Sequence, residues 1–372
     1  MKKWIILILI AAVWGYGAIL AWTMRDAGSQ VFIYYGEGEA VEEQLISHAL
    51  DGEQEQTRKM LPEITAWSRA ERLKVLNPGL GRSEEADCIA VYGLKEMASS
   101  PRLLGGTYGC RSDQDGCVIS SGLAMELFGG LDVAGKYIWC RQKPYRIRGV
   151  TDESSHVILL PAKEKDAMRY MMFTYVRGAE EEGESHGMET GKSAAENFLY
   201  RNGIKSGKVL VDGTYFSSAA GLGVCLPLWI TSVWMLSGLP GSRRGIRGRT
   251  KEGIKKSIKK STKEFILAAV FSLAGLLLAW KLELKIPSDL IPSRWSDFEF
   301  WARKIGEMRS DMADMGEAGA VWWLAQMKGR LSVCLLCSFI GAAGGVIWTA
   351  DNRESGHIFR KAPYGTRHDH PG

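Results

Sequence analysis

The sequence of 372 residues has few of the side chains that enzymes use for catalysis or metal binding. It contains only six histidines. Three of them, His357, His368 and His370, lie in a polar C-terminal tail that we interpret as disordered rather than as a metal site. No Ser/His/Asp set, paired-acid motif or zinc motif occurs with usable spacing. These absences argue against an enzyme, and we expect no cofactor and no metal.

A complete nucleotide-binding loop is also missing. The segment from Gly187 to Ser193 has three residues between its two glycines, whereas a phosphate-binding loop needs four. It also follows an acidic run, which would repel phosphate. The chain is therefore predicted to lack a nucleotide-binding site of its own.

Charge is almost absent from four stretches, in which Lys281 is the only charged residue: Trp4–Trp22, Phe216–Leu239, Phe265–Leu282 and Leu331–Trp348. A helix of about 18 to 24 residues reaches across a hydrocarbon core of about 30 Å. Tryptophans near the ends of these stretches suit the headgroup level, and small residues inside the last one permit close helix contact. We predict four transmembrane helices, at 1–24, 216–240, 265–282 and 331–348, rather than buried core helices.

The first stretch follows Met1-Lys2-Lys3, so a cleaved signal peptide is the alternative. Its apolar region is longer than the usual 7 to 15 residues or so, and no small-x-small cleavage site follows it. We interpret this stretch as an uncleaved signal anchor.

The segment between the second and third stretches, 241–264, is strongly basic. It contains ten lysines and arginines and only two acidic residues, Glu252 and Glu264, which predicts a cytoplasmic position. Both termini, including the tail 349–372, are then inside, and residues 25–215 and 283–330 are outside. The net charge of +5 is thus a sign of topology in the cell membrane and not of nucleic-acid binding. Ile254 and Ile258 lie four apart among the lysines, which favours a short amphipathic helix that contacts membrane lipid.

Residues 25–215 have mixed helix and strand signals, which predict an extracytoplasmic α+β domain. Val41, Leu45, Ile46 and Leu50 repeat at helical spacing. We expect Leu61, Ile64, Trp67 and Leu73 to extend this helical pattern as far as the break at Asn77-Pro78-Gly79. After the break, strands are expected at 88–91, 117–120, 137–141, 145–150, 156–160, 170–176 and 209–211. Helices are expected from Ser121 to Phe128 and over 193–200.

The stretch from Gly116 to Val150 resembles the signature of the MacB-like periplasmic core domain of MacB-like and FtsX-like ABC transporter permeases. In that family a strand, a helix ending in Leu-Phe-Gly, an Asp-x-x-Gly-Lys turn and a hairpin follow in this order. The matching residues here are Ala124, Leu127, Phe128, Gly129, Asp132, Gly135, Lys136, Tyr145, Gly149 and Val150. The alternative is a strand–helix–hairpin unit in which the glycines have purely local roles, but the motif and the order of the apolar stretches agree independently with the resemblance.

The resemblance implies a four-helix membrane permease, because MacB-type permeases also place one transmembrane helix before the domain and three after it. It implies a separate ABC ATPase subunit and a homodimer, or a heterodimer with a related permease, and it carries over no catalytic residues. Residues that couple the ATPase to the membrane are expected in the basic segment: Arg243, Arg244, Lys255, Ile258 and Lys259. The alternative function is a membrane-anchored sensor or binding protein without transport.

Two further features bear on this interpretation. Cys110 and Cys117 flank a polar turn outside the cell and are the pair most suited to a disulfide, whereas Cys334 and Cys337 are interpreted as small apolar side chains on one helix face. The segment 283–330 departs from the family's efflux members, which have a short link there. Its apolar residues step by three and four, which predicts an amphipathic helix. That helix would lie on the membrane, pack on its own chain or pair with a second subunit; the residues are Phe298, Trp301, Ile305, Met308, Met312 and Met315.

Overall fold

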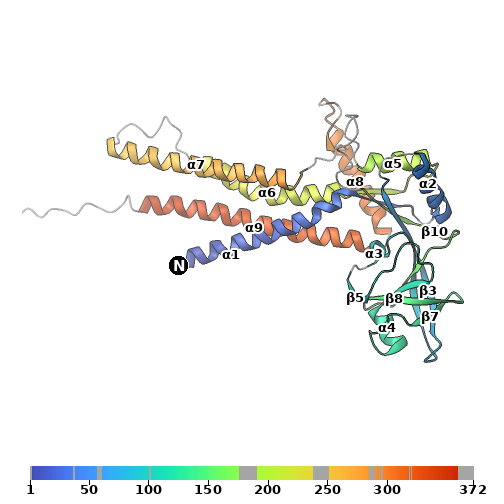
Figure 1. The fold of residues 1–372 in the computed structure, drawn as a ribbon. Coiled ribbons are helices and arrows are strands. Elements are labelled where there is room, and N and C mark those ends of the chain that lie inside the picture. The colour runs from blue at the N-terminus through green and yellow to red at the C-terminus, as the bar shows by residue number, and fades with distance from the viewer. Residues whose placement is uncertain are drawn as a thin grey trace, which may run out of the picture. The chain divides into compact units, whose positions relative to one another are not determined.

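A computed structural model describes residues 2–36, 38–56, 61–99, 102–175, 191–237, 251–284, 290–292, 294, 296–317, 319 and 321–358. The chain divides into two compact units (Figure 1). The helical unit comprises Met1–Arg25, Phe216–Lys285 and Gly329–Gly372. The α+β unit comprises Asp26–Tyr215 and Ile286–Lys328.

The helical unit contains four helices that run side by side (Figure 1). They are α1 (Lys2–Met24), α6 (Thr214–Ser237), α7 (Lys251–Lys281) and α9 (Trp322–Ile358). Among the described residues, three segments are long and apolar enough to cross a membrane: Ile5–Ser29, Thr214–Ser237 and Trp322–Ala350. The apolar part of α7, Phe265–Lys281, is shorter. Crossing of the membrane by this helix therefore stays a prediction.

Two of these helices are longer than the apolar stretches predicted. Helix α7 begins at Lys251, so the second half of the expected basic loop is helical and continuous with the apolar part that follows. This half is rich in lysine and glutamate, which favour helix, and has no proline. Ile254 and Ile258 therefore lie on α7 and not on a separate short helix. Helix α9 extends beyond the expected span 331–348 at both ends.

The α+β unit contains the remaining helices and all the strands. As far as β6 these are β1 (Gln30–Tyr34), β2 (Val41–Glu42), α2 (Glu43–Gln56), β3 (Glu63–Asn77), β4 (Arg82–Tyr92), α3 (Lys95–Ala98), β5 (Leu103–Gly106) and β6 (Gly116–Ser120). They are followed by α4 (Ser121–Phe128), β7 (Tyr137–Cys140), β8 (Lys143–Thr151), β9 (Val157–Pro161), β10 (Ala167–Met168), β11 (Tyr170–Thr174), α5 (Gly191–Arg201), β12 (Val209–Asp212) and α8 (Phe300–Glu317).

Most strands join one mixed sheet of ten, in the order β12-β1-β11-β3-β4-β9-β6-β8-β5, with β7 paired to β3 and β8. The pairs β4/β9 and β6/β8 are parallel, and the other pairs are antiparallel. The sheet has two hydrophobic cores. One gathers residues of β1, β11, α2 and α5, and the other gathers residues of β6, α4, β8 and β9. Strand β3 contributes to both cores, with an irregularity between Ala70 and Leu73.

The helix expected to continue through Ile64, Trp67 and Leu73 is not formed. These residues lie in β3, where Ile64 faces Phe173 of β11 and Trp67 faces both Tyr170 of β11 and Val91 of β4. Ile64, Thr65, Ala66 and Trp67 are all buried, because β3 is a central strand that is covered on both faces. Such a strand shows no alternation of apolar and polar residues, so its sequence does not distinguish it from a helix.

Candidate functional site

The stretch that resembles a family signature folds as one strand–helix–hairpin module. Strand β6 leads into α4, which Ser120 caps: its Oγ accepts a hydrogen bond from Leu123 N at 3.3 Å and another from Val157 N at 3.0 Å. The cap is thus Ser120 and not Ser121, whose hydroxyl donates instead to Glu153 O at 2.8 Å. Helix α4 ends at Gly129, whose φ of 75° is accessible to glycine at little cost. Strands β7 and β8 then form the expected hairpin.

Apart from the half-buried Phe128, the motif residues divide into two groups. Those of the first group are buried or shape the backbone: Ala124, Leu127, Tyr145, Gly149 and Val150 lie in the interior, and Gly129 and Gly135 have positive φ. The second group is at the surface, where Asp132 and Lys136 are exposed and the Lys136 ammonium lies 5.3 Å from the ring centroid of Phe128. The first group explains why the module folds, and only the second group can contact a partner directly.

A charged cluster holds the loop that leads into β6. Arg148 Nε donates to Asp113 Oδ2 at 2.6 Å, and the Asp113 side chain is nearly buried. This hydrogen bond keeps the pKa of Asp113 below its ordinary value. Lys95 is buried beside the pair, with Nζ 3.4 Å from Gly116 O, and its pKa is lowered by that burial. The cluster fixes the edge of the module and was not foreseen from the sequence, since its three members are far apart along the chain.

Part of the chain is similar to two solved domains from transporter proteins. One is the extracellular domain of the noncanonic ABC-type transporter YknZ from Gram-positive bacteria, at 15% identity and a TM-score of 0.33, over 47% of this chain and 95% of that chain. The other is the periplasmic region of MacB from Actinobacillus actinomycetemcomitans, at 14% identity and a TM-score of 0.36, over 50% of this chain and 89% of that chain. No protein-family model and no curated protein matches the chain.

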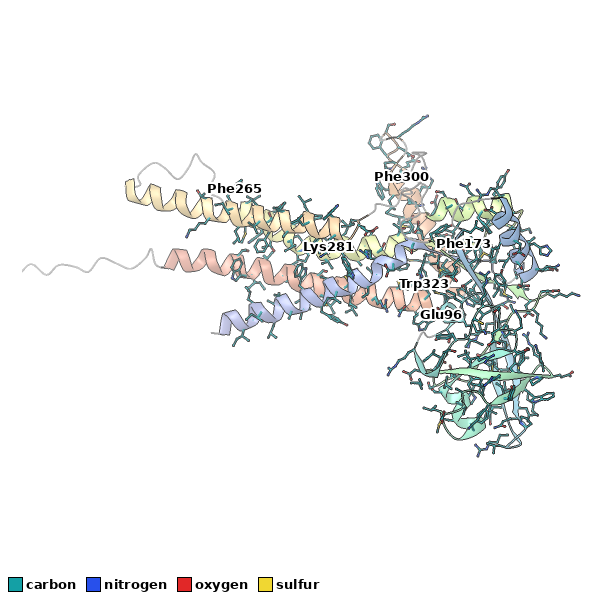
Figure 2. The ribbon with its side chains drawn as sticks, viewed as in Figure 1. Glu96, Phe173, Phe265, Lys281, Phe300 and Trp323 are labelled. Atoms are coloured by element: carbon teal, nitrogen blue, oxygen red, sulfur yellow. The ribbon has the colours of Figure 1, made fainter. Side chains whose placement is uncertain are left out.

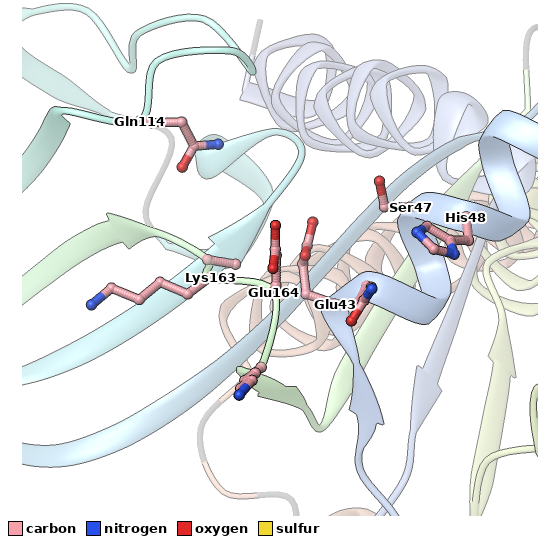
Figure 3. Close-up of a pocket in the computed structure, with 9 residues that line it drawn as sticks. Glu43, Ser47, His48, Gln114, Lys163 and Glu164 are labelled. Carbon is pink, nitrogen blue, oxygen red and sulfur yellow. The ribbon is translucent and has the colours of Figure 1, made fainter.

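A cavity in the α+β unit has a volume of about 600 Å³ and a largely polar lining (Figure 3). It lies between α2, the loop 162–165 and Gln114, and its walls include Glu43, Ser47, His48 and Glu164. Figure 3 shows the carboxylates of Glu43 and Glu164 next to each other. Burial raises the pKa of Glu43, and Glu164 and Asp166 raise it further. Lys163 and Lys165 also line the cavity, so its walls carry charges of both signs and suit a polar group. None of the motif residues lines it.

The cysteines of the α+β unit are free thiols. Cys110 is exposed and its Sγ lies 3.4 Å from Ser112 Oγ, whereas Cys117 is buried in β6. The disulfide expected between them is therefore not formed, because the Cys117 side chain belongs to the hydrophobic core. Cys88 and Cys140 share that core, and burial raises the pKa of Cys88 to about 12. Among the described residues, no group of three or more His, Cys, Asp or Glu side chains is placed to hold a metal ion.

Small residues allow the helices of the helical unit to approach closely. Cys334 Sγ lies 3.5 Å from Gly17 O of α1 and 3.7 Å from Ala220 O of α6, so this thiol sits where three helices meet. A Cβ atom at Gly344 would lie 2.6 Å from the Ile10 side chain. Cys334 and Cys337 are thus packing residues on one face of α9, in agreement with the interpretation of the Cys-x-x-Cys pair.

Polar groups inside this unit bond to helix carbonyls. The Trp14 indole N–H donates to Val224 O at 3.0 Å, which joins α1 to α6, and the Ser232 hydroxyl donates to Ala268 O at 2.8 Å, which joins α6 to α7. Such bonds satisfy side-chain donors that would be costly to bury alone. The four helices therefore contact one another through specific bonds as well as through apolar surface.

One end of this unit has the composition of a membrane–water boundary. The Trp22 ring lies 4.3 Å from the guanidinium carbon of Arg25 and 5.7 Å from Nζ of Lys281. Arg25 also pairs with Glu283 at 3.2 Å. An indole between cations is typical of the headgroup level. This cluster marks the ends of α1 and α7 at which the chain leaves the apolar region.

Three of the five expected coupling residues lie at the other end of α7. Arg243 and Arg244 are outside the described residues, as are residues 187–190 of the incomplete phosphate-binding loop. Lys255, Ile258 and Lys259 lie on the first part of α7. A helix of this length rises about 1.5 Å per residue, so it links the basic end to Lys281 without a break.

Proposed function

We propose that the chain is the permease subunit of an ABC-type transporter that works with a separate ATPase. One observation carries this proposal: an α+β unit with the Gly116–Val150 module is inserted after the first of four apolar helices that pack on one another. In this proposal all four helices cross the cell membrane, both termini are cytoplasmic, and residues 25–215 are outside.

The α7 helix supports a role in coupling. Its basic first part, with Lys255 and Lys259, continues into the apolar part that packs against α6 through the Ser232–Ala268 bond. A push on the basic end would then move the apolar part as a rod, whereas a flexible loop would absorb it. We propose that the ATPase binds at this end, near Arg243 and Arg244, and that the permease acts as a homodimer or with a related permease.

A second candidate function is a membrane-anchored binding or sensing protein without transport. The polar cavity beside Glu43 and Glu164 favours it, because a cavity of this size can hold a small ligand. A sensor has no need of an ATPase. The two functions are separated by isolating the tagged protein from its native membrane in mild detergent. A partner that carries a complete phosphate-binding loop and hydrolyses ATP supports transport, and a chain recovered without such a partner supports sensing.

A further inference from the structure

Helix α8 is amphipathic in the manner expected, but the face that its own unit covers is the charged one. Asp314 of α8 pairs with Lys208, just before β12, at 2.9 Å, and only 27% of its side chain is exposed. The Lys304 side chain, at 16% exposure, is covered still more. Burial raises the pKa of Asp311, while Lys192 of α5 and Lys304 lower it. Helix α8 is therefore held near β12 by the Lys208–Asp314 ion pair, while Asp311, which stays exposed, feels the charge of Lys192 on α5.

The apolar face of the same helix is bare. Figure 2 places Phe300, where α8 begins, apart from the core residue Phe173. Beyond it, Trp301, Ile305 and Met312 are 51%, 48% and 66% exposed, and Met308 is exposed as well. Phe298, just before the helix, is 92% exposed. Only Met315, at the end of the stripe, is buried. The exposed stripe therefore consists of Phe298, Trp301, Ile305, Met308 and Met312.

An exposed stripe of large apolar side chains indicates a surface that contacts something else. A helix that packs on its own domain turns its apolar face inward, since burial of each large side chain is worth about 1.5–3 kcal/mol. In α8 the apolar side is exposed and charged side chains are covered instead. Packing of α8 on its own chain, one of the three positions considered for this helix, therefore does not cover the stripe.

Chain connectivity keeps the C-terminal end of α8 close to the start of α9. Five residue steps separate Glu317 from Trp322, the first residue of α9, and at about 3.6 Å per step they span at most about 18 Å. The first turn of α9 is fixed in the α+β unit, because Trp323 Nε1 donates to Gln30 Oε1 at 2.7 Å and its ring stacks on Phe32. From there α9 continues through the apolar segment Trp322–Ala350, which is long enough to cross a membrane.

The side chains of the stripe suit the boundary between lipid headgroups and acyl chains. Trp301 and Phe298 are at its start, where aromatic rings prefer this level, and flexible methionines follow. Arg309 is exposed and lies close to the stripe on the helix, so its aliphatic part can lie on the lipid while the guanidinium reaches a phosphate.

We propose that the exposed stripe of α8 lies in the outer lipid surface of the bilayer, as a membrane contact of the α+β unit in addition to its transmembrane connections. The charged face then holds the unit through Lys208 and Lys192, so that α8 joins domain and lipid. This inference rests on insertion of α9 in the membrane and is independent of transport.

The test uses the full chain carrying Cys110→Ser, so that this exposed thiol takes no label. The protein is placed in nanodiscs of zwitterionic and anionic phospholipid at a ratio of three to one. A spin label is attached to Cys at position 312, by Met312→Cys, or at position 310, by Ser310→Cys. Both positions are exposed on α8, but Ser310 lies on the side away from the stripe. Collisions with oxygen, which concentrates in lipid, and with a water-soluble nickel chelate are measured for each label.

We expect the ratio of oxygen to nickel collisions to be several-fold higher at position 312 than at position 310. Equal ratios at the two positions, with free access of nickel, would overturn the proposal. Exclusion of both reagents at position 312, together with dipolar broadening between labels, would also overturn it and assign the stripe to a second copy. The collision measurement needs no ATPase. A negative result therefore leaves the proposed transport function unaffected, and the absence of an ATPase partner would leave the membrane contact of α8 unaffected.

Discussion

Gly17 of α1 lies so close to Cys337 of α9 that a Cβ atom added to the glycine would be 2.8 Å from the cysteine Cβ. Two helices that approach this closely are joined by many small van der Waals contacts, which are the main cohesive force between helices in lipid. A substitution at Gly17 therefore shows how much the stability of the helical unit depends on the contact between α1 and α9.

We expect Gly17→Leu to destabilise the helical unit by about 1–3 kcal/mol, because the larger side chain would force the two helices apart. Gly15→Leu is the matched control, since nothing lies within 4 Å of a Cβ atom at that position. Thermal unfolding of both variants in detergent makes the comparison. An equal loss of stability in the two variants would mean that α1 and α9 do not pack at Gly17.

The free thiols of the α+β unit allow a labelling experiment that tests both its orientation and its redox state. A membrane-impermeant maleimide added to intact cells should label Cys110 without prior reduction, because this thiol is exposed and unpaired with Cys117. The Cys110→Ser variant should lose the label. Buried Cys88, with a pKa of about 12, and buried Cys117 and Cys140 should stay unlabelled until the protein is denatured.

If Cys110 is labelled only after reduction, Cys110 and Cys117 form a disulfide in the cell. Labelling only after the cells are opened would instead place the α+β unit in the cytoplasm.

The pairing of Asp113 with Arg148 predicts a dependence of stability on pH. The pKa of Asp113 is lowered in the folded protein, so the unfolded chain binds its proton more tightly. The stabilisation is therefore present above the unfolded pKa of about 3.9 and is lost as the pH falls through the folded pKa. Asp113→Asn should be less stable than the parent at pH 7, and the difference should vanish in strong acid. Urea unfolding at a series of pH values measures this difference, and a difference that does not change with pH would contradict the assignment.

The ion pair between Lys208 and Asp314 should contribute to the attachment of α8. Lys208→Glu places two negative charges together and should weaken the attachment by up to about 1 kcal/mol, as expected for a partly exposed pair. Amide hydrogens of α8 should then exchange up to about fivefold faster, as measured by mass spectrometry. The double variant Lys208→Glu/Asp314→Lys should restore slow exchange. Faster exchange in the double variant as well would indicate that the pair does not hold the helix.

Local features of the sequence were sufficient for much of the fold. Helix α4 and the β7–β8 hairpin follow from a serine cap, a glycine in the left-handed region and a tight turn, all of which act over a few residues. The stripe on α8 follows from its spacing of three and four. The apolar stretches predict helices because hydropathy and length alone decide whether a segment can cross a membrane.

Long-range pairing could not be predicted in the same way. Gln30–Tyr34 forms β1 because β11 and β12 come to pair with it from positions more than a hundred residues away. The charged cluster of Lys95, Asp113 and Arg148 likewise exists only once the strands are in register. Nor does spacing show which face of α8 its domain covers, since this depends on where Lys208 and Lys192 lie in the fold.

Coupling of the chain to a separate ATPase is tested most directly by ATP hydrolysis of the purified complex. The tagged chain is isolated from its native membrane, and ATP turnover is compared for the parent and for Lys255→Glu/Lys259→Glu, which reverses two charges on the basic part of α7. Lys205→Glu, a substitution at an exposed lysine of the α+β unit, is the control. We predict that the parent and the control bring down a partner with a complete phosphate-binding loop and hydrolyse ATP, and that the α7 variant loses both. A folded chain without associated ATP hydrolysis would contradict the account.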